Sequence, residues 1–184
     1  MCKARYGRRN LQSVLREEEA AIAIPGELER TFRAHHGMVF RTAYRITGNA
    51  ADAEDVLQTV FLRLLRKPEQ LEAMENAESY LRRAAINAAL DVIRLRRSTD
   101  LEEVPEPMDH SAHDDGELRQ ALARALAQLK PRPAEIFALR FLEGLSNPEI
   151  ARMLGISQVL VAVIVHRTRQ QLRKELGAYL GDRS

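Results

Sequence analysis

The sequence predicts an all-α protein in which two helical domains are joined by an acidic, flexible linker. Apolar residues recur at three- and four-residue spacing along most of the chain, and no long alternating run of Val, Ile and Thr indicates a strand. The charge distribution supports the division into domains. Eight of the 26 acidic residues and none of the 28 basic ones lie between Ser98 and Leu118, so the small net charge of +2 hides a basic surplus elsewhere.

Composition narrows the range of functions. The 184 residues can form one large domain or two small ones, and 45% apolar with 29% charged residues is ordinary for a globular protein. The single cysteine, Cys2, cannot form an internal disulfide, which suits a reducing compartment. No apolar run approaches the roughly 20 residues that span a bilayer, and the basic start lacks the apolar core of a signal peptide. We therefore expect a cytoplasmic protein without a membrane span.

Three helices are expected in the first half of the chain. Residues 1–25 form an extension, basic and then acidic, without a clear core-facing pattern. A helix over 26–46 follows. Asn49 can cap a second helix over 50–66, which has the most pronounced apolar face in the chain. A long third helix is expected over 77–97, where it completes the first domain.

The first domain, 26–97, is followed by a linker, 98–116, in which Pro105 and Pro107 interrupt any helix. Its acidic residues are expected to shield the basic domains in the free protein. The second domain, 117–180, contains four expected helices, over 117–129, 133–143, 147–154 and 157–176.

No enzymatic motif is present. The sequence contains no Gly-rich phosphate loop, nucleophile elbow or paired-carboxylate site, so we predict that the protein is not an enzyme and uses no cofactor. The linker does hold Asp and His side chains near His110 and His113. A polar, proline-containing segment gives such ligands no supporting shell, and no metal is predicted there.

The most informative motif consists of two short helices separated by Gly155. Ser146 and Glu149 form a capping box, with Pro148 in the first turn. Gly155 can adopt the left-handed conformation that ends the first helix, and Ser157 can cap the second. This pattern is typical of a helix-turn-helix, which places its second helix in the major groove of DNA. The alternative is an αα-hairpin that only packs a core.

Three segments in this order carry a family resemblance: DAEDVLQTVFLRLLR (52–66), ESYLRRAAINAALDVIRLRR (78–97) and LKPRPAEIFALRFLEGLSNPEIARMLGIS (129–157). They resemble, in turn, the polymerase-docking helix, the promoter-melting helix and the entry to region four of the sigma-70 family of bacterial transcription initiation factors. The length and the acidic linker are similar to the small extracytoplasmic-function (ECF) class, which keeps only regions two and four. The resemblance covers most of the chain, from about Leu28 to Leu176.

The resemblance implies that the helix over 50–66 docks on a coiled coil of the polymerase clamp. The side chains that it would present are Asp52, Asp55, Gln58 and Leu62. The residues also permit a plainer interpretation, in which the apolar positions are core and the acids solvate the helix start, where the dipole favours negative charge.

The helix over 77–97 would face the minus-ten promoter element. Arg83, Asn87, Asp91 and Arg94 lie on one continuous face, which we call the polar stripe. Arginines neutralise phosphates, and the Asn87 amide can read an exposed base edge. Asp91 either accepts a hydrogen bond from a cytosine amine or holds a neighbouring arginine. The predicted minus-ten residues are Arg82, Arg83, Asn87, Asp91, Arg94, Arg96 and Arg97.

The second helix of the helix-turn-helix would contact the minus-thirty-five element, with Val161 and Ile164 facing inward. The predicted DNA-facing residues are Ser157, Gln158, Val159, Ala162, Val163, His166, Arg167 and Arg169. Because few of these side chains can hydrogen-bond to base edges, we expect readout through the backbone, DNA shape and thymine methyl groups. The alternative is that a partner covers this apolar face when DNA is absent.

The resemblance also implies partners: core RNA polymerase, contacted at its clamp and flap, promoter DNA and an anti-sigma factor that clamps the two domains. The free chain is expected to be a monomer in the bacterial cytoplasm. One alternative is a helix-turn-helix regulator that binds DNA without being a polymerase subunit, which leaves residues 52–97 unexplained. Another is a helical adaptor that binds only proteins, which leaves the arginines of 82–97 unexplained.

Overall fold

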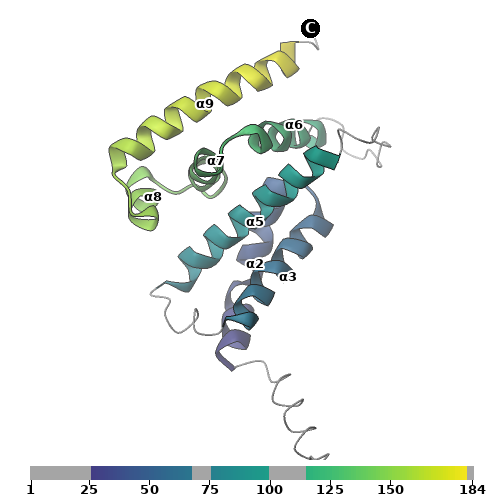
Figure 1. The fold of residues 1–184 in the computed structure, drawn as a ribbon, viewed down its shortest axis with the longest axis vertical. Helices are drawn as coiled ribbons and strands as arrows, with labels where there is room; N and C mark the ends of the chain where they lie inside the picture. The colour runs from purple at the N-terminus through teal and green to yellow at the C-terminus, as the bar shows by residue number, and fades with distance from the viewer. Residues whose placement is uncertain (1–25, 68–75, 100–114, 182–184) are drawn as a thin grey trace, which may run out of the picture.

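The computed structural model describes residues 26–67, 76–99 and 115–181, and every regular element in this part of the chain is helical (Figure 1). The predicted all-α class is therefore confirmed. The N-terminal module contains α2 (Gly26–Thr47), α3 (Ala50–Arg66) and α5 (Ala77–Thr99). The C-terminal module contains α6 (Asp115–Gln128), α7 (Pro131–Phe137), the π-helical turn η1 (Ala138–Leu142), α8 (Asn147–Leu154) and α9 (Gln158–Gly181). The extension 1–25 and the linker between α5 and α6 lie outside the described residues.

Local capping signals set several helix boundaries. Gly48 has a φ of +67°, which lets the chain leave α2, and the side chain of Asn49 accepts a hydrogen bond from the Asp52 backbone N–H at 3.1 Å. As a result α3 begins at Ala50, as predicted. α7 begins at Pro131, where the missing N–H costs nothing. The helix expected over 133–143 is in fact α7 followed by the π turn η1.

The N-terminal module packs α2 and α3 against α5. Leu28 and Val39 of α2 are buried, and so are Val56, Val60 and Leu64 of α3. Phe32 and Tyr44 of α2 remain 40% and 37% exposed. Phe32 makes an edge-on contact with the ring of Phe61, and Tyr44 stacks on the ring of Phe40.

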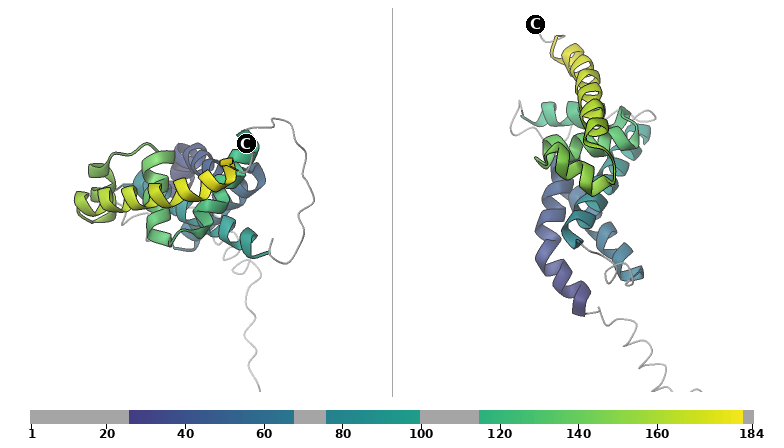
Figure 2. Two further views of the ribbon diagram at one scale, coloured as in Figure 1. Left: turned by 90° about the horizontal axis from the view of Figure 1, so that it is seen from above. Right: turned by 90° about the vertical axis from the view of Figure 1, so that its left-hand side faces the viewer.

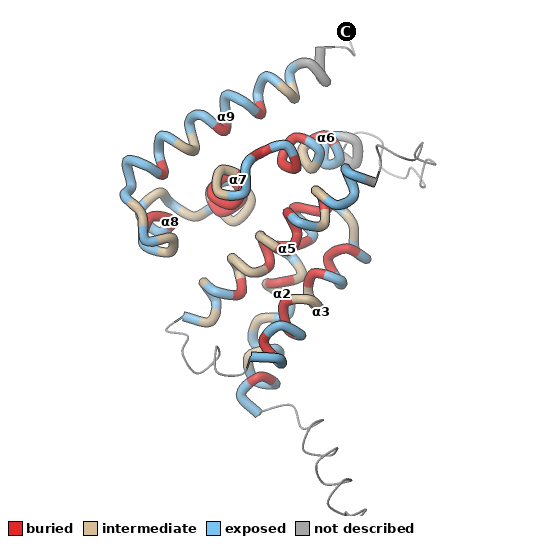
Figure 3. The backbone as a smooth tube through the Cα atoms, in the orientation of Figure 1, coloured by how far each residue is buried: buried red, intermediate tan, exposed pale blue. Residues whose placement is uncertain are grey.

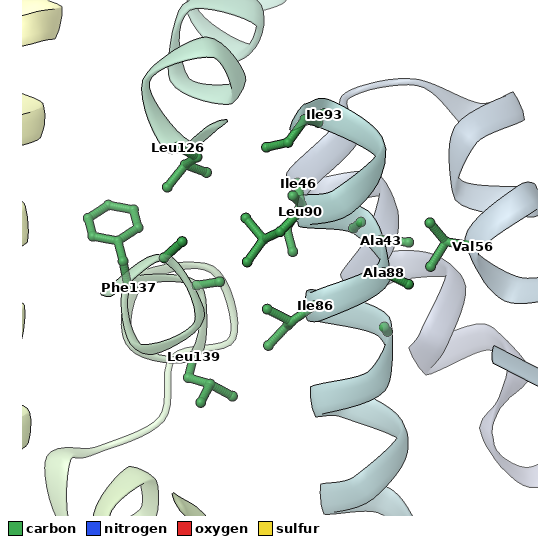
Figure 4. Packing of buried hydrophobic residues seen from close by; sticks show 14 of the residues in the cluster. Ala43, Ile46, Val56, Ile86, Ala88, Leu90, Ile93, Leu126, Phe137 and Leu139 are labelled. Atoms are coloured by element: carbon green, nitrogen blue, oxygen red, sulfur yellow. The ribbon is translucent and has the colours of Figure 1, made fainter. Parts of the chain in front are cut away.

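The two modules share one continuous apolar core, with α5 in the middle. Figure 4 shows Leu126, Phe137 and Leu139 of the C-terminal module opposite Ile86, Leu90 and Ile93 of α5, while Ala43 and Val56 lie on the other side of that helix. Ile86, Leu90, Leu126 and Leu139 are fully buried. α5 is thus enclosed on two faces, and the arrangement in the free chain is closed.

The C-terminal module stacks its helices away from the N-terminal one. α6 and α7 lie between α5 and α9 in Figure 1, and Figure 2 shows α2 and α9 at opposite ends of the molecule. Figure 3 shows buried residues concentrated along α5 and α7, whereas most of α9 is exposed. The helix that is predicted to enter the DNA groove therefore lies on the outside.

Candidate polymerase and nucleic-acid interfaces

An apolar hollow of about 320 Å³ lies between α2 and α3. Its apolar wall includes Phe32, Phe61, Leu62 and Leu65, and Gln58 borders it. Leu62 and Leu65 are 48% and 41% exposed, although α3 has ample core-facing positions. Exposed leucines beside a preformed hollow are typical of a surface that binds another protein. The predicted residues Gln58 and Leu62 meet here, and Asp55 is exposed on the same helix.

Asp52 does not share this exposed position. Asp52 is only 7% exposed, and its Oδ1 accepts a hydrogen bond from Arg96 Nη2 at 2.6 Å. Burial raises the pKa of the Asp52 carboxyl above its ordinary value, an effect that the Arg96 guanidinium opposes. Within the described residues, Oδ2 is buried without a hydrogen-bond partner. In this structure Asp52 joins the start of α3 to the end of α5, and Arg96 points to Asp52 and away from the polar stripe.

The polar stripe on α5 exists as predicted, but its side chains are bonded to protein. Arg83 and Asn87 both donate to Glu135 Oε1, from Nε at 2.9 Å and from Nδ2 at 3.4 Å. Arg94 Nη1 lies 3.3 Å from Asp91 Oδ1, which matches the expectation that Asp91 can hold a neighbouring arginine. Arg94 Nη2 also donates to the carbonyl oxygen of Leu129 at 3.4 Å.

Other predicted minus-ten residues lie around the stripe. Arg82 bonds to Glu78 on its own helix and to Glu143 of the C-terminal module, and Arg97 is exposed near the end of α5. The partners Glu135 and Glu143 were not predicted from the sequence. The sequence around these two glutamates does not distinguish them from the other glutamates of the chain. Their partners in α5 lie 48 to 61 residues earlier.

The helix-turn-helix forms through the predicted local contacts. Ser146 and Glu149 make a reciprocal capping box, and these hydrogen bonds hold the pKa of the Glu149 carboxyl below its ordinary value. Gly155 ends α8 with a φ of +63°, and Ser157 Oγ accepts from the Leu160 backbone N–H at 3.2 Å. Val161 is fully buried and Ile164 half-buried, so both face inward as expected.

The outer face of α9 is free of core contacts. All eight predicted DNA-facing residues, Ser157, Gln158, Val159, Ala162, Val163, His166, Arg167 and Arg169, are exposed. Val159 is 74% exposed, an unusual position for a valine. Apolar and small side chains lie at the start of this face, and the arginines follow one to three turns later. Such a surface can contact thymine methyls with its first turns and phosphates with the rest.

The described residues contain no group of three or more His, Cys, Asp or Glu side chains placed to hold a metal ion. No single described helix is long and apolar enough to cross a membrane. α8 and Gln158–Gly177 of α9 would together be long and apolar enough, but the two helices meet at a bend of 112°.

Fold and site together define a helical DNA-binding protein with a helix-turn-helix in one module and an exposed apolar hollow in the other. Family models match both modules: Sigma-70 region 2 over residues 31–99 and Sigma-70 region 4 over residues 119–172.

Relatives agree with these matches. The RNA polymerase sigma-E factor of Streptomyces coelicolor is 34% identical over 155 residues, which cover 83% of this chain and 87% of that protein. The ECF RNA polymerase sigma factor SigL of Mycobacterium tuberculosis is 32% identical over 168 residues, or 86% of this chain and 95% of that protein. ECF sigma factor SigE of Mycolicibacterium smegmatis is 35% identical over 156 residues. That match covers 80% of this chain but only 60% of the longer relative.

Solved structures share the fold. CnrH, solved in complex with the cytosolic domain of CnrY, superposes with a TM-score of 0.54 at 25% identity, over 88% of this chain and 94% of CnrH. The sigma factor RpoE of Bartonella quintana, solved with the anti-sigma factor NepR, superposes with a TM-score of 0.50 at 18% identity, over 81% of this chain and 96% of RpoE.

The chain belongs to the sigma-70 family and, within it, to the ECF class of RNA polymerase sigma factors. It is a DNA-binding regulatory subunit that directs core RNA polymerase to promoters and transcription initiation. The alternative of a helix-turn-helix regulator that acts without polymerase is not favoured.

Proposed function

We propose that the chain performs this role through three separate surfaces and without covalent chemistry of its own. α3 docks on the polymerase clamp through Asp55, Gln58 and Leu62, α5 holds the melted minus-ten strand, and α9 contacts the minus-thirty-five duplex while its module lies near the flap. Binding energy from captured single-stranded bases offsets the unpairing of DNA. Because core polymerase and promoter DNA are its partners, the protein acts in the bacterial cytoplasm.

The observation that carries this proposal is the exposed apolar hollow on α3 in the same chain as the helix-turn-helix. A regulator that acts alone has no use for such a docking surface beside an arginine-rich helix. In the proposal Asp52 has an indirect part, since its bond to Arg96 fixes the angle between the docking helix and the melting helix.

We also propose that the free chain is a monomer and that an anti-sigma factor binds it. The support is the likeness to RpoE of Bartonella quintana, which was solved with an anti-sigma factor, together with exposed apolar side chains on both α3 and α9. A partner that covers these side chains in the absence of polymerase would keep them from water.

Run-off transcription with purified bacterial core polymerase tests the proposal. Genomic promoter fragments, including the region upstream of the chain's own coding sequence, are expected to give specific transcripts only when the chain is present. Leu62→Asp is expected to abolish transcripts and retention on immobilised core polymerase, because it places a charge in the docking hollow.

Leu118→Asp is the matched control, since Leu118 is a similarly exposed leucine (47% against 48%) on α6, away from the hollow. Equal retention of both variants on core polymerase would contradict the assignment of α3. Absence of transcripts together with absence of core binding by the unaltered chain would contradict the proposal as a whole.

A further inference from the structure

Three of the four side chains in the polar stripe of α5 bond to the C-terminal module. Arg83 and Asn87 end on Glu135 of α7, and Arg82 reaches Glu143, the residue directly after η1. Arg94 donates to a backbone carbonyl between α6 and α7. Arg82, Arg83, Asn87 and Arg94, four of the groups proposed to hold the minus-ten strand, are therefore already bonded to the C-terminal module in the free chain.

Glu143 is the most enclosed of the carboxylates involved. Its side chain is only 1% exposed, Oε1 accepts from Arg45 Nη1 at 2.9 Å, and Oε2 accepts from Arg82 Nη1. Both arginines belong to the N-terminal module, Arg45 to α2 and Arg82 to α5. A carboxylate removed from water is tolerated only with charged partners in place. Glu143 thus fastens η1 to two helices of the other module.

Glu135 makes a second connection, of a different kind. Its side chain is 5% exposed, and Oε1 accepts from Arg83 and Asn87 of α5. Oε2 accepts from Arg132 Nη1 at 3.0 Å, which belongs to the same module as Glu135. If the modules separated, Glu135 would keep one of its partners, whereas Glu143 would lose every partner that the described residues provide. Glu143 is therefore the more specific indicator of closure.

A polar cavity of about 420 Å³ opens beside Glu143. Its lining includes three arginines, Arg41, Arg45 and Arg82, and two glutamates, Glu78 and Glu143. Carboxylate and phosphate bind arginine with the same paired donor geometry. A DNA phosphate and Glu143 are consequently alternative partners for the same nitrogen atoms, and Arg82 cannot offer those atoms fully to both.

We propose that Glu143 and Glu135 act as an intramolecular latch, which holds the free chain closed and blocks the promoter-melting face of α5. This inference rests on the proposed DNA-binding role of α5. Promoter engagement then requires the C-terminal module to move off α5 and the two carboxylates to give up Arg82 and Arg83. Because apparent affinity falls in proportion to the fraction of binding-competent molecules, the latch weakens DNA binding by the free chain.

Glu143→Lys tests the latch, and Glu78→Lys is its matched control. Both carboxylates bond to Arg82, and both substitutions change the net charge by the same amount. Glu78, however, lies one turn before Arg82 on α5 itself, 2.5 Å from Nη2, and is 58% exposed. Only Glu143→Lys breaks a bond between modules, and it places a third cation against Arg45 and Arg82.

Two readouts separate opening from DNA binding. Energy transfer between dyes on Ala51→Cys in α3 and Gln170→Cys in α9, in a full-length chain carrying Cys2→Ser, reports separation of the modules. Fluorescence anisotropy of a fluorescein-labelled single-stranded oligonucleotide of mixed sequence reports binding. Glu143→Lys is expected to lower energy transfer and to tighten binding about tenfold, because it raises the fraction of open molecules by about that factor. Glu78→Lys is expected to leave energy transfer unchanged and to tighten binding about twofold through its added charge.

Equal effects of the two variants on affinity, with energy transfer unchanged in both, would overturn the latch. Separation of the modules in Glu143→Lys without any gain in binding would instead overturn the proposed role of α5 in holding DNA. If Glu143→Lys loses helical circular dichroism, the double variant Glu135→Gln with Glu143→Gln takes its place, because amides keep the shape of the side chains. Its control is then Glu78→Gln, with the same expected directions.

Discussion

Truncation of Leu90 tests whether the two modules share a single core. Leu90 is fully buried on α5, and Figure 4 shows it on the side of that helix that faces Leu126 and Phe137 of the C-terminal module. A side chain that supports both modules should affect the unfolding of both when it is shortened. Leu95, on the same helix but 69% exposed, provides the comparison.

The expected magnitude follows from burial. Leu90→Ala removes three carbon atoms from a site without solvent contact, which costs about 2.4 kcal/mol of transfer free energy at ~0.8 kcal/mol per methylene. The residual cavity raises the loss of unfolding free energy to about 3–4 kcal/mol. For Leu95→Ala we expect a change below about 1 kcal/mol, since most of that side chain is already in water.

The assay is urea unfolding followed by circular dichroism, because the sequence contains no tryptophan for fluorescence. Both variants are expected to unfold in one cooperative transition, with Leu90→Ala shifted to lower urea and its Tm lowered by about 10 °C. Two separate transitions, of which Leu90→Ala moves only the first, would refute the shared core. A loss below about 1 kcal/mol for Leu90→Ala would refute its burial.

Three further outcomes are expected. Ser146→Ala removes the α8 cap and should lower the unfolding free energy measured in urea titrations by about 1 kcal/mol. The share of this loss that comes from the hydrogen bonds between Ser146 and the Glu149 carboxylate should vanish as pH falls through the lowered pKa of Glu149. Because burial raises the pKa of Asp52, ionisation at this site lowers stability as pH rises. Urea midpoints should therefore show Asp52→Asn gaining on the unaltered chain as pH rises above the ordinary range of an aspartate carboxyl. Val161→Asp should unfold the helix-turn-helix in circular dichroism, whereas Val159→Asp should keep the fold and weaken binding to minus-thirty-five duplex in anisotropy.

Elements whose boundaries depend on neighbouring residues were predictable from the sequence. The expected ranges 50–66 and 147–154 coincide with α3 and α8, because Asn49, Ser146 and Gly155 act on backbone groups within a few residues of themselves. The π-helical turn at Ala138–Leu142 was missed. Its register gives no local pattern, and its residues Ala138 and Leu139 are buried in the shared core.

Contacts between distant segments were less predictable. The periodicity of α5 identified the polar stripe, but no sequence pattern pairs Arg83 with a glutamate 52 residues later. The same limit explains Asp52: its position at a helix start suggested an exposed acid, and only the packing of α5 shows Arg96 beside it. The roles of these residues in polymerase and DNA binding stay predictions, whereas their positions in the fold are now defined.

The hollow between α2 and α3 also has a pharmacological consequence. Its volume of about 320 Å³ and its walls of Phe32, Phe61, Leu62 and Leu65 fall within the size and character of sites that hold small organic ligands. The edge-on contact of the two rings, with centroids 4.9 Å apart, gives the floor a fixed shape. A compound seated there would occupy the surface proposed for the clamp, so a fragment screen against this hollow is a direct route to inhibitors that silence one set of promoters and spare the polymerase itself.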